Sequence, residues 1–421
     1  MNLRILTQTQ QQIRYLGRPV RIFLIVNVIE GIILSIWILF FNFYILGLGF
    51  DRQFLGLVNS VTALATLILG IPIGILSDRI GRQRALFLGV GIHLLGATLE
   101  LWTIHPTLLL CMAFLNGTGR MLFLLNVAPF LAGASKAETR TFLFSLNFGL
   151  VILAGVMGNL LAGYLADWFT VMLQVPATSV ATYRSTLLLA VSLSCLSLIL
   201  LTFVREPKPE NFANQLPAKS AIQSGGNLAS ALKGALANPM IRQLALVQLV
   251  FGLGVALLTP YINLYFDEKF QVGPQTLGRI FSLKALFTGL VALLIPRLVQ
   301  KSGSRIKIAV FFQFMGGVSW LLLGFTPGFS AAVCGFLLGG IFLNTPIPLV
   351  EAFSMEQVRE SQRATLVSIR ELSWQTSWGI GPYLSGSLQE HSGFSPIFVL
   401  SVAAIWLASL LNNIFFGKIE Q

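Results

Sequence analysis

Long apolar stretches separated by short polar ones make up most of this chain. Windows of about twenty residues with few charges recur along its 421 residues, and this is the length that an α-helix needs to cross a bilayer. A transmembrane β-barrel would instead alternate apolar and polar positions over about ten residues. The pattern therefore predicts an all-α polytopic membrane protein with twelve transmembrane helices, at residues 20–46, 54–76, 85–104, 107–134, 141–166, 184–204, 241–266, 275–298, 306–326, 329–352, 363–388 and 394–417.

The two halves of the chain repeat one another. Residues Arg140–Ser145 resemble Arg363–Ser368, and Leu55-Gly56 resembles Leu277-Gly278 at a nearly constant separation. The longest polar stretch lies between the halves and is rich in Pro, Ser, Asn and Gly, as is typical of a linker. The repeat predicts two pseudo-symmetric six-helix bundles and a cytoplasmic linker, with limits at 1–204, 241–421 and 205–240 respectively.

Composition agrees with a membrane protein and changes how its charge is interpreted. The chain is 55% hydrophobic and 10% charged, with a mean hydropathy of +0.79 and a net charge of +12. Most of its 28 Lys and Arg residues fall in every second loop. Loops of membrane proteins that face the cytoplasm are enriched in Lys and Arg. We therefore expect both termini on the cytoplasmic side of the plasma (inner) membrane, and no nucleic-acid partner. Cys111, Cys195 and Cys334 lie inside apolar stretches and are expected to be buried, without a disulfide.

A short polar segment, residues 74–84, interrupts two apolar stretches. It reads Gly-Ile-Leu-Ser-Asp-Arg-Ile-Gly-Arg-Gln-Arg. Together with the twelve expected spans and the internal repeat, it resembles the major facilitator superfamily, whose signature between helices 2 and 3 is Gly-x-Leu-x-Asp-Arg-x-Gly-Arg-x-Arg. The resemblance covers essentially the whole chain. It implies two bundles that rock about a binding site near the middle of the membrane.

The same segment is expected to form a gate on the cytoplasmic side. Asp78 ends the second span, where the positive N-terminal end of the eleventh span, near Arg363, would attract its carboxylate. Arg79 or Arg82 is expected to pair with Glu138. The predicted cytoplasmic gate comprises Gly74, Asp78, Arg79, Gly81, Arg82, Arg84, Glu138 and Arg363.

Charged residues inside the expected spans are candidates for function, because they are costly in lipid. Glu30 lies roughly 15 Å into the first span at 1.5 Å of rise per residue, and Arg120 lies at a similar depth in the fourth. We expect Glu30 to alternate between a protonated form and a form paired with Arg120, which would couple transport to protons. The arrangement resembles proton-coupled multidrug antiporters of the superfamily. The alternative is a structural ion pair. His93 is expected to hydrogen bond between helices.

Further polar and aromatic residues are expected to bind the substrate. Lys284 is either a fixed positive charge for an anionic group or a side chain that extends to the membrane surface. Glu371, Trp374 and Trp378 share one helical face. The predicted substrate-binding residues are Asn27, Trp37, Asn116, Gln248, Asn263, Lys284, Asn344, Glu371, Trp374 and Trp378.

No motif for nucleotide, metal or covalent catalysis stands out, so neither an enzyme, a cofactor nor a metal is expected. The sequence favours a secondary active transporter that exports a small amphipathic organic compound by alternating access. We expect protons to drive it, with sodium as the alternative ion, and a monomer in contact with membrane lipid. The runner-up is uptake or exchange of an organic anion held by Arg120 and Lys284. A third hypothesis is a non-transporting receptor or a lipid scramblase with the same fold.

Overall fold

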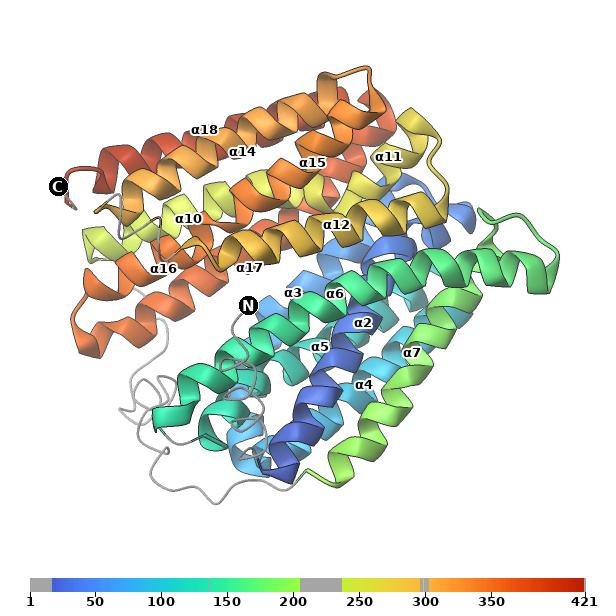
Figure 1. Cartoon of the computed structure of the whole chain (residues 1–421), viewed down its shortest axis with the longest axis horizontal. Coiled ribbons are helices and arrows are strands. Elements are labelled where there is room, and N and C mark those ends of the chain that lie inside the picture. The colour runs from blue at the N-terminus through green and yellow to red at the C-terminus, as the bar shows by residue number, and fades with distance from the viewer. Residues whose placement is uncertain (1–16, 136, 205–236, 296–297, 299–302, 420–421) are drawn as a thin grey trace, which may run out of the picture.

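The computed structural model describes residues 17–135, 137–204, 237–295, 298 and 303–419, and every regular element in these ranges is a helix. Most of the predicted linker, residues 205–236, lies outside the described residues. The helices form two bundles that meet along one side (Figure 1). This arrangement confirms the predicted fold of twelve spans in two six-helix bundles.

The N-terminal bundle contains one helix for each predicted span. Helix α2 packs against α6 and α7, and α5 packs against α3 and α4. The helices are α2 (Arg18–Gly47), α3 (Arg52–Ile80), α4 (Arg82–Trp102), α5 (Pro106–Gly133), α6 (Ala137–Leu173) and α7 (Val180–Thr202). Helix α6, with 37 residues, is longer than its predicted apolar window, because a helix continues past the last strongly apolar residue until a terminating signal is reached.

The C-terminal bundle has two spans that are interrupted. Proline lacks a backbone N–H and clashes with the preceding turn, and the interruptions coincide with Pro260 and Pro346. One span is therefore α10 (Pro239–Leu258), η1 (Thr259–Tyr261) and α11 (Ile262–Phe270), and another is α15 (Phe329–Asn344) and α16 (Pro346–Glu356). The remaining helices are α12 (Pro274–Ala292), α14 (Arg305–Phe325), α17 (Glu360–Ser392) and α18 (Ser395–Phe416).

Short polar side chains begin several of these helices. The first backbone N–H groups of a helix have no partner within it, and a side-chain oxygen at the N-cap satisfies one of them. Asp51 Oδ1 accepts from Phe54 N at 2.7 Å at the start of α3, for example. The capping residues are Asp51, Ser179, Asn238 and Ser304.

Ten helical segments of the described chain are long and apolar enough to cross a membrane. Helices α12 and α17 are not among them, although they occupy the positions of transmembrane helices in the C-terminal bundle. Their main partners in the other bundle are α6 and α3, respectively. Because these helices face protein along much of their length, their polar residues avoid the lipid.

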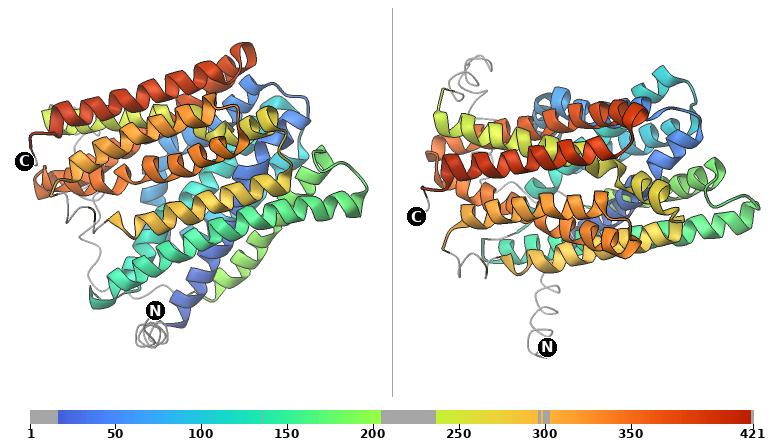
Figure 2. Two further views of the ribbon diagram at one scale, coloured as in Figure 1. Left: turned by 45° about the horizontal axis from the view of Figure 1, so that its top comes forward. Right: turned by 90° about the horizontal axis from the view of Figure 1, so that it is seen from above.

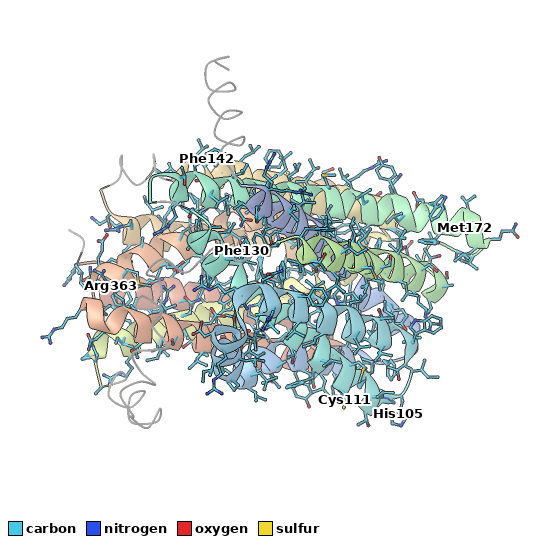
Figure 3. The ribbon with its side chains drawn as sticks, turned by 90° about the horizontal axis from the view of Figure 1, so that it is seen from below. His105, Cys111, Phe130, Phe142, Met172 and Arg363 are labelled. Atoms are coloured by element: carbon cyan, nitrogen blue, oxygen red, sulfur yellow. The ribbon has the colours of Figure 1, made fainter. Side chains whose placement is uncertain are left out.

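The two bundles converge at one end of the molecule (Figures 1 and 2). We call this end, with Gly47 and Met172, the far side. We call the opposite end, with Arg18 and Phe416, the terminal side. Figure 3 shows Met172 and Arg363 at these opposite ends. Helices α3 and α6 diverge from α17 and α12 toward the terminal side (Figure 1).

Glycine allows the two bundles to touch backbone to backbone on the far side. A Cβ atom on Gly56 of α3 would lie 2.5 Å from the carbonyl oxygen of Pro382 in α17. A Cβ atom on Gly163 of α6 would lie 2.8 Å from the Cα atom of Gln275 in α12. We call these two contacts, α3 with α17 and α6 with α12, the far-side seam. Small residues permit such close approach in membrane helices.

We expect Gly56→Ala to destabilise this conformation, because its methyl group would displace the α17 backbone. Overpacking of this kind costs about 1–3 kcal/mol, and it should lower the melting temperature of the purified protein. Gly91→Ala is the matched control, since a Cβ atom on Gly91 of α4 meets no atom within 4 Å. Equal melting temperatures for the two variants would contradict the close packing of the seam.

Candidate functional site

A cavity of about 150 Å³ lies within the C-terminal bundle, where α12, α15 and α17 face one another. Four aromatic side chains stand in its wall, and the rings of Trp374 and Trp378 lie 6.2 Å apart between centroids. We call it the central cavity. It is lined by Val255, Thr259, Ile262, Lys284, Trp320, Phe336, Gly339, Gly340, Leu343, Asn344, Ile347, Trp374 and Trp378.

Lys284 is the charged residue of the central cavity. Its side chain crosses from α12 to α15, where a Cβ atom on Gly340 would lie only 2.7 Å from Lys284 Cγ. Lys284 Nζ lies 5.3 Å from the ring centroid of Phe336, within the range of a cation–π interaction. Within the described ranges, no acidic side chain pairs with this ammonium group. Of the two expectations for Lys284, the structure therefore favours the cavity over the membrane surface.

A second cavity, of about 290 Å³, adjoins the first toward the terminal side. We call it the vestibule. Arg370 lies in its wall and is 8% exposed, with its guanidinium donating to Ser354 Oγ at 2.9 Å and to Gln248 Oε1 at 3.1 Å. The vestibule is lined by Gln248, Ile347, Glu351, Val367, Arg370, Glu371 and Trp374. Ile347 and Trp374 line both cavities.

The other predicted substrate residues lie elsewhere. Asn27 Nδ2 donates to Asn147 Oδ1 at 2.6 Å inside the N-terminal bundle, and Trp37 stacks on Phe41 with centroids 4.6 Å apart. Asn263 belongs to the contact between the bundles, where it donates to the carbonyl oxygen of Leu39 at 2.8 Å. None of these three residues lines the central cavity or the vestibule.

Glu30 and Arg120 lie inside the N-terminal bundle, near enough for their charges to interact. Each lowers the electrostatic cost of burying the other, but they do not form an ion pair in direct contact. Glu30 faces Ser194 and Ser197 of α7, and its Oε1 atom is buried without a hydrogen-bond partner among the described residues. Arg120 also lies near His93 of α4.

A buried chain of polar side chains continues from His93, and the sequence did not reveal its full extent. His93 Nδ1 lies 2.7 Å from Asn116 Oδ1, and Asn116 Nδ2 donates to Glu100 Oε2 at 2.8 Å. Glu100 is only 1% exposed. The interhelical hydrogen bond expected for His93 is present, but Asn116 is enclosed between α4 and α5. The signal for Glu100 was its position seven residues after His93, on the same helical face.

The signature segment lies on the terminal side. Gly81 adopts φ of +89° in the turn between α3 and α4, a conformation that glycine reaches without strain. Arg82 donates to the carbonyl oxygen of Pro129 in α5, and Asp78, Arg79 and Arg84 are exposed. Gly74 has open space where a Cβ atom would lie.

The partners expected for the signature segment are Arg363 and Glu138. Arg363 Nε donates to the carbonyl oxygen of Met355 at 3.0 Å, within the C-terminal bundle. The side chain of Glu138 lies outside the described part of the structure, so its predicted pairing with Arg79 or Arg82 stays a prediction.

Arg52 forms the main polar contact between the bundles on the far side, which the sequence did not predict. Arg52 Nη2 lies 2.5 Å from Glu268 Oε1 of α11, and the backbone N–H of Arg52 donates to Glu390 Oε2 at 3.0 Å. Beside it, Gln53 Nε2 donates to the hydroxyl of Tyr383 at 3.2 Å. The available signal was that Arg52 is one of few basic residues on this side.

The cysteines lie on the outside of the bundles. Cys111, Cys195 and Cys334 are free and exposed, so the prediction that they are buried was wrong. Apolar stretches of a membrane helix face lipid as well as the protein core, and hydropathy does not distinguish the two faces. Across the described ranges, no cluster of His, Cys, Asp and Glu is arranged to hold a metal ion.

Comparison with known proteins decides the family. The sequence profile of the Major Facilitator Superfamily matches residues 23–339 and 244–420. The chain belongs to the Major Facilitator Superfamily. It is an integral membrane protein. The nucleoside transporter NupG has the same fold, with a TM-score of 0.75 and 14% identity over 96% of this chain and 100% of NupG.

Curated relatives match over part of the chain. Sugar efflux transporter A of Escherichia coli K12 is 25% identical over 169 residues, which are 39% of this chain and 43% of the relative. The multi-drug resistance efflux pump PmrA homolog of Lactococcus lactis is 29% identical over 176 residues, 39% of this chain and 41% of the relative. The chain thus spans less than half the length of each of these relatives.

We expect Glu268→Gln to loosen the far side, because it removes the charge that pairs with Arg52. The side chains of Arg52 and Glu268 are 23% and 37% exposed, so the pair stabilises closure by at most about 1 kcal/mol, or roughly fivefold in the equilibrium. Spin labels at His105 and Gln271, on the far-side ends of the two bundles, should report a larger population of long distances by electron paramagnetic resonance.

Salt provides the control for this measurement. The difference between Glu268→Gln and the unsubstituted protein should shrink at high ionic strength, because salt screens the ion pair. An unchanged distance distribution at low salt would show that Arg52 and Glu268 do not hold the far side closed.

Proposed function

We propose that this protein exports a small amphipathic organic compound by alternating access, and that the central cavity is its binding site. The observation that carries the proposal is a cavity in the C-terminal bundle with four aromatic side chains and Lys284 in its wall. Apolar walls with a few fixed polar groups are typical of sites for small organic molecules. We also propose that the terminal side faces the cytoplasm of the inner membrane, and that the transporter works as a monomer.

The contacts between the bundles support an inward-facing conformation under this orientation. Polar contacts across the interface, such as that of Arg52 with Glu268, lie on the far side or near mid-depth. The vestibule extends the central cavity toward the terminal side. A compound would therefore reach Trp374 and Trp378 from the cytoplasm, and separation of the far-side seam would release it outside.

The curated relatives support export. Their names describe sugar efflux and multidrug efflux, and flat aromatic faces such as those of Trp320 and Trp378 suit the apolar face of a sugar ring or a drug ring. Because the matches cover less than half of each relative, substrate and direction are proposals for this chain.

Glu30 and Arg120 are proposed to couple export to protons. A buried carboxyl group can either hold a proton or, as a carboxylate, interact with a neighbouring Arg. The change between these two states alters the charge inside the bundle and needs no metal or cofactor. Glu30 lies within reach of Ser194, Ser197 and Arg120, so its two protonation states have different partners. This difference would bias the two conformations of the transporter.

The signature segment is proposed to close the terminal side after the compound has left. Asp78 and Arg79 are exposed at the end of α3, and Gly74 leaves space for another helix to approach. In the outward-facing conformation these residues would meet the start of α17, near Arg363. Attraction between Asp78 and the positive end of that helix would stabilise the closed terminal side.

One observation favours a second function, the uptake or exchange of an organic anion. Lys284 offers the central cavity an ammonium group that has no acidic partner among the described residues, which suits a carboxylate or a phosphate. Arg120, the other anchor expected for an anion, lies inside the N-terminal bundle near Glu30. It therefore fits the proton-coupling role better than contact with a compound in the central cavity.

Transport in proteoliposomes tests the proposed coupling. We expect addition of a transported compound to move protons across the membrane, and Glu30→Gln to abolish accumulation driven by a pH gradient. Because binding and conformational exchange do not need the proton, Glu30→Gln should retain exchange of labelled for unlabelled compound. Arg18→Gln, at the exposed start of α2, is a control for loss of charge in the same helix.

Three outcomes would contradict parts of this account. Accumulation by Glu30→Gln that still follows the pH gradient would remove Glu30 from the coupling. Exchange without any uphill accumulation would exclude active transport. Lipid movement between leaflets without exchange of any soluble compound would indicate a scramblase, the alternative with the same fold.

A further inference from the structure

The charges along the two cavities differ in sign from one end to the other. We propose that the central cavity and the vestibule together bind one zwitterionic compound, with its anionic group at Lys284 and its cationic group at Glu351 and Glu371. The inference rests on the proposed function and narrows the class of substrate that this transporter would carry.

The two cavities form a continuous space. Ile347 of α16 and Trp374 of α17 line both of them, so a ligand that reaches from one to the other passes along the same indole ring. Trp378 lies one turn further along α17, at a ring-centroid distance of 6.2 Å from Trp374. The middle of the combined site is therefore aromatic, and only its ends carry charge.

The inner end of this space is positive. Lys284 is the one ionisable residue among those that line the central cavity, and its ammonium group has no acidic partner in the described part of the chain. Phe336 supplies a cation–π contact at 5.3 Å, which offsets only part of the cost of a charge that has left water. A bound carboxylate or phosphate would complete the neutralisation of this charge.

The outer end of the space is negative. Glu351 and Glu371 line the vestibule and are exposed to it, whereas Arg370 is largely buried. Two nitrogens of the Arg370 guanidinium donate to Ser354 and Gln248, while its Nε has no hydrogen-bond partner among the described residues. Glu371 Oε1 accepts a hydrogen bond from Gln375 Nε2 at 2.7 Å. The wall of the vestibule thus carries two carboxylates and one guanidinium. Because the carboxylates are the more exposed groups, an incoming ligand meets them first. This arrangement favours an ammonium or another organic cation.

The distance between the positive and the negative end of the site requires that several atoms separate the two charged groups of the ligand. Glu371 and Trp378 are seven residues apart on α17, or about 10 Å at the rise of an α-helix. Lys284 and Trp378 line the central cavity, whereas Glu371 lines the vestibule. An α-amino acid, whose charges lie on adjacent atoms, is too short to reach both ends, whereas a compound with a ring between its charges fits the aromatic middle.

Binding of three matched probes to the purified full-length protein tests this inference. The probes are 4-(aminomethyl)benzoate, which is zwitterionic, benzylamine, which has only the cation, and 4-methylbenzoate, which has only the anion. We expect calorimetry to show that the zwitterion binds at least about tenfold more tightly than either control, since a hydrogen bond to a charged group contributes a factor of this order.

Substitutions assign each charge to one end of the site. Lys284→Gln should weaken the binding of the zwitterion and of 4-methylbenzoate by about tenfold, because it removes the positive end of the site. The affinity for benzylamine should stay unchanged. Glu371→Gln should weaken the binding of the zwitterion and of benzylamine, and the affinity for 4-methylbenzoate should stay unchanged. Lys307→Gln, which removes an exposed charge outside both cavities, should affect none of the three.

Equal binding of the three probes, or no binding of any of them, would overturn the inference, and so would loss of affinity without charge selectivity in the two variants. The comparison of probes on the unsubstituted protein does not depend on the folding of any variant. The proposed function is judged separately by exchange of any compound in proteoliposomes. It stands if exchange and uphill accumulation occur without a preference for zwitterions, and it fails if no compound is exchanged or accumulated.

Discussion

Backbone contact between the two bundles at the far-side seam is the constraint on which the rest of the structure depends. Gly56 and Gly163 remove the side chains that would keep α3 from α17 and α6 from α12. Arg52 and Glu268 add an ion pair at the same end. With the far side closed in this way, the bundles diverge toward the terminal side (Figure 1). The central cavity and the vestibule lie in the C-terminal bundle, and both have residues of α17, a helix of the seam, in their walls.

The membrane determines where polar groups are placed. Every charged group within a span needs protein, water or a ligand around it, because lipid satisfies none of its interactions. The N-terminal bundle encloses Glu30, Arg120 and Glu100 among polar neighbours, whereas the C-terminal bundle leaves Lys284 at a cavity. The bundles are thus alike in fold but different in chemistry, and this division underlies the proposal that one binds protons and the other the compound.

The sequence predicted the fold well, because apolar windows, basic loops and the segment from Gly74 to Arg84 are local patterns. The site was predicted in part. Lys284, Trp374 and Trp378 line the central cavity as expected, but Trp37, which lies on a similar helical stripe, packs against Phe41 instead. Which residues share a cavity depends on the rotation of each helix. The Arg52–Glu268 pair spans 216 positions, and no local pattern indicates such a partner.

Cross-linking across the seam tests the central claim, that transport requires the far side to open. Gln53 and Tyr383 hydrogen bond at 3.2 Å across the bundles, so cysteines at these positions in a background without the native cysteines should react with a short cleavable bifunctional thiol reagent. The account predicts that the cross-link stops transport and that cleavage restores it, while cross-linking cysteines at Arg305 and Glu356, within one bundle, has no effect. Undiminished transport with the linker between positions 53 and 383 intact would contradict the account.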